Sequence, residues 1–270
     1  MTGIWPGETQ CVAVIGFDVD GPSAMIQRNA EVAKMPSTLS HGDFGPQVAL
    51  PRILELLQTY EVPASFYVPG WIGERFPQQV ATIADGGHEI AHHGYLHEPP
   101  ATLTREQEAE VLDRGIEILQ GITGERPRGY RSPSWELSEH SLDLLAERDF
   151  VYDSSLMGDD APYIVTAPGG RELVEIPVHW SLDDAPFMVF NPAVNRTNVT
   201  ASPAQLYDVW ESAFDELYER GRAFVLTMHP WIIGRAGRLK MLERLLDHMR
   251  ERPGVIFQRG IDLATTFGEH

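Results

Sequence analysis

Short apolar runs alternate with amphipathic stretches along most of the chain, and this alternation limits the possible folds more than any other feature. The run from Val12 to Phe17 is continuously apolar, which is typical of a strand buried on both faces. Comparable runs predict further strands at 64–68, 88–91, 128–131, 150–153, 173–176, 224–228 and 255–257. This α/β alternation favours a mainly parallel sheet, and the number of strands favours a barrel, complete or incomplete.

Helix signals separate these strands. Apolar spacing predicts helices at 51–60, 77–85 and 239–250, one capped by Ser138, and others that begin near 104 and 202. Thr104 and Gln107 form a capping-box pattern, and Pro203 stands at a first helical position. The segments 21–47 and 177–201 are expected to be irregular insertions that act as lids or interfaces, because they are long for barrel loops.

The length of the chain fits one catalytic domain over residues 1–270. Of its 270 residues, 43% are hydrophobic, which is enough for a large core. No apolar run is long enough to span a bilayer, and the first ten residues lack the pattern of a secretory signal. Cys11 is the only cysteine, so an intrachain disulfide cannot form. Together these features predict a cytoplasmic protein.

The charge of the chain is strongly acidic. The formal net charge is -18 at pH 7. A surface of this sign repels nucleic acid and anionic membranes, so we expect neither as a partner. Solubility alone explains the same charge, so the excess of acids does not point to any particular ligand.

Two carboxylates, Asp18 and Asp20, follow the first predicted strand. Their spacing of two puts both side chains on one side if the strand continues through them. One carboxylate could then bind a metal while the other handles a proton. A turn at Asp20-Gly21 with a solvated Asp18 is the alternative, and the Asp-Xaa-Asp pattern alone favours that turn.

Two histidines, His93 and His97, are four residues apart. On a helical turn this spacing places both imidazoles on one face, where they can bind one ion. Together with Asp20 they leave positions open for water and substrate. Such a set suits Zn²⁺, Fe²⁺ or Co²⁺ without choosing among them. The nearby His88 and His92 are expected to be structural or surface histidines.

Two further residues offer charge and proton chemistry. His229 follows the run 224–228 and could protonate a leaving nitrogen near neutral pH. A hydrogen-bonded core histidine is the alternative for this residue. Arg131 could pair with Asp18 and keep that carboxylate ionised, or it could be a plain surface arginine.

Aromatic residues lie beside these motifs. Trp135 and Trp231 could wall a pocket and stack on a sugar or another flat ring. Packing in the core explains both residues equally well. For Trp180 and Trp210, core packing is the expected role.

Five short motifs occur in a fixed order along the chain. They are FDVDG at 17–21, HGYLH at 93–97, RSPSW at 131–135, DSSL at 153–156 and TMHP at 227–230. As a set they resemble those of the polysaccharide deacetylases, which form carbohydrate esterase family 4 with the NodB homology fold. No single motif is specific, but the combination is. The resemblance implies a distorted (β/α)7 barrel, which agrees with the predicted strands.

The resemblance also implies roles for the motif residues. Asp18 resembles the catalytic base, Arg131 the residue that tethers it, and His229 the general acid. The implied metal ligands are Asp20, His93 and His97. The expected cofactor is one divalent ion, zinc first, with iron or cobalt as alternatives. A backbone N–H near Ser134 is expected to bind the oxyanion.

Two departures from the family pattern bear on the substrate. The usual Asp-Asp pair is Asp18-Val19-Asp20 here, and the chain has longer insertions, with 173–177 and Asp183-Asp184. Both resemble a non-secreted subgroup that includes peptidoglycan deacetylases, allantoinase-like enzymes and cyclic imide hydrolases. The resemblance therefore implies hydrolysis of a C–N bond more firmly than it implies a substrate.

We expect a metal-dependent hydrolase of a non-peptide amide bond. An N-acetylated sugar is the usual family substrate, whereas a small cyclic imide or ureide fits a cytoplasmic location. A non-catalytic sugar- or metal-binding module is a third reading. Asp18 and His229 count against it, because binding alone does not require them beside three ligand-type residues.

The long segments also bear on assembly. The stretch 187–190 is apolar and lies within the second of them. We expect one or both segments to form a subunit interface in a dimer or tetramer. They could instead be lids over the pocket of a monomer.

Overall fold

The computed structural model describes residues 4–268, so the first three residues of the N-terminal stretch considered above lie outside it. Its sheet has the strand order β6-β7-β5-β4-β3-β2-β1-β8, and β9 also pairs with β1. The strands are β1 (Cys11–Asp18), β2 (Ala64–Val68), β3 (Glu89–His92), β4 (Gly129–Tyr130), β5 (Tyr152–Asp153), β6 (Tyr163–Thr166), β7 (Glu172–Glu175), β8 (Ala223–Met228) and β9 (Val255–Phe257).

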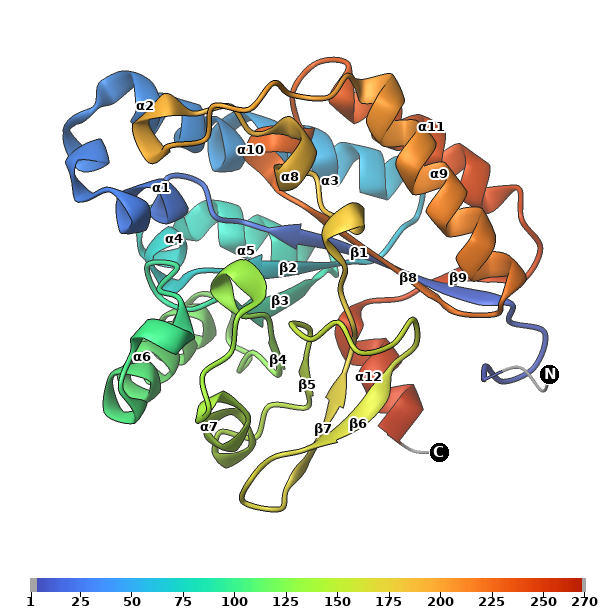
Figure 1. Cartoon of the computed structure of the whole chain (residues 1–270), viewed down its shortest axis with the longest axis horizontal. Coiled ribbons are helices and arrows are strands. Elements are labelled where there is room, and N and C mark those ends of the chain that lie inside the picture. The colour runs from blue at the N-terminus through green and yellow to red at the C-terminus, as the bar shows by residue number, and fades with distance from the viewer. Residues whose placement is uncertain (1–3, 269–270) are drawn as a thin grey trace.

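The strands curve into a distorted barrel that is nearly parallel throughout (Figure 1). Among the strands of the described residues, only β6 and β7 pair in the antiparallel sense. On the open side of the barrel, a single parallel bridge joins Asp183 to Thr227 of β8. The distorted (β/α)7 barrel expected from the sequence is therefore confirmed, and β6 and β9 are additions to it.

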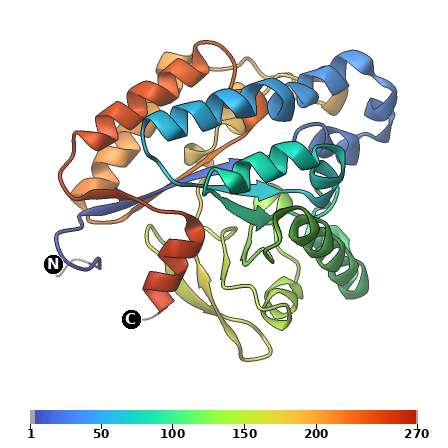
Figure 2. The ribbon, with the colours of Figure 1, turned by 180° about the vertical axis from the view of Figure 1, so that it is seen from behind.

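Helices cover the outside of the sheet, and Figure 2 shows α3, α5, α6 and α11 on the face seen from behind. The helices are α1 (Ser23–Arg28), α2 (Pro36–Phe44), α3 (Leu50–Thr59), α4 (Gly70–Arg75), α5 (Pro77–Asp85), α6 (Arg105–Thr123), α7 (Ser141–Glu147), α8 (Ala185–Met188), α9 (Pro203–Glu219), α10 (Pro230–Ile233), α11 (Arg238–Arg250) and α12 (Gly260–Gly268). In the described residues, no helix combines the length and the apolar character that a bilayer crossing requires.

The predicted local signals explain most of these elements. All eight residues of β1 are buried, as its continuous apolar run predicts. Both capping boxes are present, Thr104 with Gln107 at the start of α6 and Ser202 with Gln205 at the start of α9. The apolar face of α3 packs into the main core beneath the sheet.

Two expectations were wrong, and one strand was missed. The segment 21–47 is mostly helical rather than irregular, because Pro36 begins α2 and the Asn29 side chain caps a short 3-10 helix at Ala30–Lys34. The helix expected at Ser138 begins at Ser141, and the Ser138 hydroxyl instead accepts the N–H of His140. Strand β6 was not expected, because its residues are half-buried and exposed in turn at the sheet edge.

Candidate metal-binding active site

One cavity collects the predicted site residues at the carboxyl ends of the strands. Its volume is about 280 Å³. The predicted residues that line it are Asp18, Asp20, His93, His97, Ser134, Trp135, His229 and Trp231. Arg131 lies behind Asp18 and does not line the cavity. Motifs far apart in the sequence meet here because parallel strands end at the same rim of the barrel.

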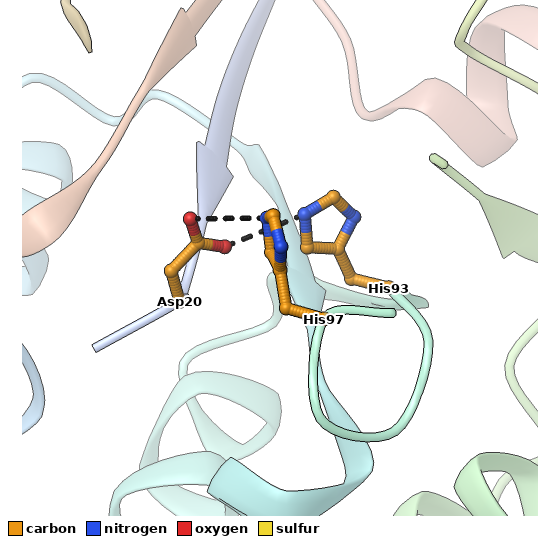
Figure 3. Close-up of side chains that lie close together, drawn as sticks. All are labelled: Asp20, His93 and His97. Atoms are coloured by element: carbon orange, nitrogen blue, oxygen red, sulfur yellow. Dashed lines mark ion pairs between the residues drawn. The ribbon is translucent and has the colours of Figure 1, made fainter. Parts of the chain in front are cut away.

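The three predicted metal ligands face one another (Figure 3). Each oxygen of the Asp20 carboxylate lies 3.4 Å from one Nε2, Oδ1 from that of His93 and Oδ2 from that of His97. Two ligands about 2.0–2.1 Å from a tetrahedral ion lie about 3.4 Å apart. Asp20 Oδ1 is buried with no hydrogen-bond partner among the described residues. The three residues therefore fit a divalent cation.

Protonation of these groups also suits a metal. His93 Nδ1 lies 2.7 Å from the carbonyl oxygen of Arg131, so Nδ1 carries a proton and Nε2 is the ring nitrogen that faces Asp20. Burial alone would raise the pKa of Asp20, but the imidazoles of His97 and His93 outweigh it and lower that pKa. Asp20 is therefore an ionised ligand near neutral pH.

The two histidines do not lie on a helical turn, so that expectation was wrong. Residues 93–97 form a loop in which Gly94 and His97 both have positive φ, at 73° and 66°. The Glu98 carboxylate holds the loop by accepting the N–H groups of Tyr95 and Leu96 at 3.1 and 2.7 Å. The loop, rather than helical periodicity, brings the imidazoles together. His92, expected to be structural, is buried against α6 and contacts the Leu112 carbonyl.

Asp18 is held by a buried arginine. Arg131 Nη1 donates to Asp18 Oδ1 at 2.8 Å, and its other nitrogens donate to the carbonyl and hydroxyl of Ser154. The guanidinium also lies over the Tyr67 ring at 3.8 Å. Gly16 makes room for it, since a Cβ there would lie 3.2 Å from Nη1. Arg131 is fully buried, which excludes the surface alternative.

A residue missed at the sequence level, Asp184, orients His229. Asp184 Oδ1 lies 2.7 Å from His229 Nδ1, and Oδ2 accepts the His229 backbone N–H at 3.0 Å. His229 Nε2 then points into the site, 3.6 Å from Asp20 Oδ2. The Asp183-Asp184 pair is visible in the sequence, but 45 residues separate Asp184 from His229, and no local pattern connects them.

Carboxylates control the protonation of His229. Burial alone would lower the pKa of His229, but the charges of Asp184 and Asp183 outweigh it and raise that pKa well above 6.5. His229 is therefore protonated near neutral pH. The same three residues have ligand atoms close enough for a metal. However, the 2.7 Å separation of His229 Nδ1 and Asp184 Oδ1 is that of a charge-assisted hydrogen bond.

Aromatic rings form part of the cavity wall. The rings of Trp135 and Trp180 stack with centroids 4.2 Å apart. Trp180 is 44% exposed, so its expected role in the core was wrong, whereas Trp210 is fully buried as expected. Ser134 lies between Pro133 and Trp135 in a short helical turn with a positive φ of 61°. This strained turn directs Ser134 and Trp135 toward the cavity.

Similarity to known proteins agrees with the motifs. The family model described as polysaccharide deacetylase matches residues 38–152. A peptidoglycan deacetylase of Helicobacter pylori is 34% identical over 257 residues, which cover 86% of this chain and 88% of the relative. The chain belongs to the polysaccharide deacetylase family. A peptidoglycan deacetylase-like protein of Gibberella zeae is 28% identical over 88% of this chain and 80% of its own.

Solved structures show the same fold. A crystal structure of a candidate polysaccharide deacetylase from Mycobacterium smegmatis has a TM-score of 0.96 and 37% identity, covering 100% of this chain and 94% of that one. The crystal structure of PuuE allantoinase has a TM-score of 0.85 and 24% identity, covering 98% and 92%. At that identity the allantoinase supports the fold alone. Family and fold are confirmed, while the roles of individual site residues stay predictions.

Proposed function

We propose that this member of the polysaccharide deacetylase family is a metal-dependent N-deacetylase of an N-acetylated saccharide. One observation carries the proposal: the converging Asp20, His93 and His97 share a cavity with a carboxylate held by Arg131 and a histidine held by Asp184. The relative named peptidoglycan deacetylase supports a saccharide substrate. Zinc is the proposed ion, since two imidazoles and a carboxylate are a common ligand set for catalytic zinc.

Each group has a distinct task in this proposal. A divalent ion bound by Asp20, His93 and His97 would supply Lewis acidity toward an amide carbonyl and toward water. Asp18 accepts the proton of the attacking water, because Arg131 fixes one oxygen and leaves Oδ2 facing the cavity. His229 donates its Nε2 proton to the departing nitrogen. The backbone N–H near Ser134 is the proposed oxyanion donor, and Trp135 and Trp231 the sugar platform.

Replacing Asp184 with asparagine should move the alkaline limb of the kcat profile to lower pH by about 1–3 pH units. His229 acts as an acid only while protonated, so activity falls as pH rises through its pKa. The Asp184 charge raises that pKa, and its removal lowers it. Asp183→Asn should move the limb in the same direction but by less, since Asp183 lies 3.7 Å from His229 Nδ1 and contributes its charge without a hydrogen bond. An unmoved limb in Asp184→Asn would remove His229 from the role of acid.

A second candidate function is hydrolysis of a small cyclic imide or ureide. The confined cavity and the stacked Trp135-Trp180 wall favour a flat, small substrate. Assays of an N-acetylglucosamine oligomer and of hydantoin with the same metal-loaded protein separate the two functions. Turnover of the oligomer supports the deacetylase, whereas turnover of hydantoin alone would replace it with the imidase.

We also propose a homo-oligomer, a dimer or tetramer, assembled through the segment 177–201. Phe190 and Val199 in that segment are 54% and 98% exposed, which is unusual for apolar side chains near an active site. Multi-angle light scattering should give a multiple of 30.2 kDa, and a monomer at all concentrations would refute the interface. The cytoplasmic location and the single domain over 1–270 stay predictions.

A further inference from the structure

The active-site cavity contains two solvent-exposed arginines. Arg28 and Arg196 both line it beside the metal-binding residues. Within residues 4–268, neither guanidinium makes an ion pair or a hydrogen bond to the protein. By contrast, Arg131 and Arg148 both pair with aspartates. In a chain with a net charge of -18, two solvent-exposed cations that line one cavity are available to an anionic ligand.

The backbone around Arg196 is fixed. Asn191 and Arg196 exchange two backbone hydrogen bonds, at 2.6 and 3.0 Å, across an isolated antiparallel bridge. Asn195, which closes this short turn, has the left-handed φ of 58°. Asn191 is itself buried. The turn therefore presents Arg196 at a defined position on the wall of the cavity.

The segment carrying Arg28 is attached to the same turn. Arg28 is the last residue of α1, and the next residue, Asn29, donates its side-chain N–H to the carbonyl of Ala193 at 3.0 Å. The Asn191 side chain contacts the sulfur of Met25 in α1 at 3.5 Å. The two long segments thus hold their arginines on one side of the cavity.

The other charges of the cavity are already matched. Asp18 pairs with Arg131, Asp184 and Asp183 face His229, and Asp20 belongs to the proposed metal set. Burial, and then the charge of Arg196, lower the pKa of Arg28 and together outweigh the opposite effect of Asp20, so the two guanidinium groups repel each other. A bound anion would relieve this repulsion, and a guanidinium matches the geometry of a carboxylate.

We propose that Arg28 and Arg196 bind a carboxylate of the substrate, so that the preferred substrate is an anionic amide rather than a neutral one. This inference rests on the proposed hydrolysis at the neighbouring metal site. The carboxylate could belong to an N-acetylated acidic sugar or to a small cyclic ureide that bears an acid group, which share this chemistry. The arginines then select the substrate, and the metal-binding and acid–base groups of the same cavity cleave it.

Matched substrates test the proposal. N-acetylmuramic acid differs from N-acetylglucosamine by a carboxylate-bearing lactyl ether, and hydantoin-5-acetic acid differs from hydantoin by a carboxymethyl group. In one of the two pairs, the wild-type protein should hydrolyse the anionic member with a kcat/KM at least tenfold higher than that of the neutral member. The pair that shows this preference identifies the source of the carboxylate. In Arg28→Gln/Arg196→Gln this ratio should fall to about one.

Controls separate the anion site from other effects. Arg128→Gln removes an exposed arginine just before β4, at the opposite end of the barrel, and should leave both kcat/KM values unchanged. Binding of the anionic member of the responding pair to metal-loaded Asp18→Asn protein, measured by calorimetry, should be at least tenfold tighter than binding of its neutral counterpart. A binding preference that persists without both arginines would place the carboxylate elsewhere, for example on the ion, and overturn the proposal.

The outcomes distinguish this inference from the proposed function. Hydrolysis of both members of each pair at equal kcat/KM would refute the carboxylate site and leave the deacetylase standing. Arginine-dependent binding of the acid without hydrolysis would keep the site and refute the deacetylase.

Discussion

Replacing Asp18 with asparagine should lower kcat about a thousandfold while the metal stays bound. General base catalysis contributes about 10²–10⁴ in rate, and an amide cannot take the proton of water. Asp18 is not one of the three proposed ligands, so the ion does not depend on it. The asparagine oxygen can still accept the bond from Arg131, which preserves the geometry of the site.

Steady-state kinetics and elemental analysis of the same preparations check this expectation. Asp43→Asn is a matched control, because Asp43 also pairs with an arginine, Arg75, but at the surface. Turnover within a fewfold of wild type in Asp18→Asn would exclude Asp18 as the base. Loss of the metal together with activity would instead make Asp18 a ligand.

Replacing Arg131 with methionine should lower the free energy of unfolding by about 3–5 kcal/mol, since removal of one partner leaves the buried charge of Asp18 unpaired. Both side chains are almost completely buried. The substitution also removes the contact with the Tyr67 ring and two bonds to Ser154. Activity should fall as well, because the carboxylate loses the group that orients it.

Denaturant titration at neutral pH measures this loss. Arg75→Met, which breaks a surface ion pair, should cost under about 1 kcal/mol. The double variant Asp18→Asn/Arg131→Met should recover part of the stability, because no buried charge then remains unpaired. If Arg131→Met were as stable as Arg75→Met, the buried pair would not be the element that holds the base.

Much of the fold could be predicted because its signals are local. The run at Val12–Phe17 and the capping boxes at Thr104 and Ser202 each act within a few residues. Strand β6 was not predicted because an exposed edge strand needs little hydrophobic patterning. The segment 21–47 was misjudged because α2 has no distinct apolar face, and its only strong signal is Pro36.

Only the site residues that belong to a recognisable sequence motif could be predicted. The ligands Asp20, His93 and His97 do converge, but through a loop with two positive φ angles rather than a helical turn. Asp184 was missed because the bridge between Asp183 and Thr227 is a tertiary contact with no sequence period.

The two cavity arginines were also not predicted, because they too come together only through tertiary contacts. A hydrogen bond between Asn29 and Ala193, 164 residues apart, joins the segments that carry Arg28 and Arg196. No spacing rule connects positions so distant in the chain. Only the folded structure shows that both guanidinium groups reach the cavity that holds the predicted ligands.

Release of acetate from an N-acetylglucosamine oligomer, before and after removal of the metal, tests the central claim most directly. We expect acetate from the zinc-loaded protein, none after chelation, and recovery when zinc is restored. His97→Ala should contain little metal and release little acetate, because one of three ligands is lost. Undiminished release after complete removal of the metal, or full metal content in His97→Ala, would contradict the account.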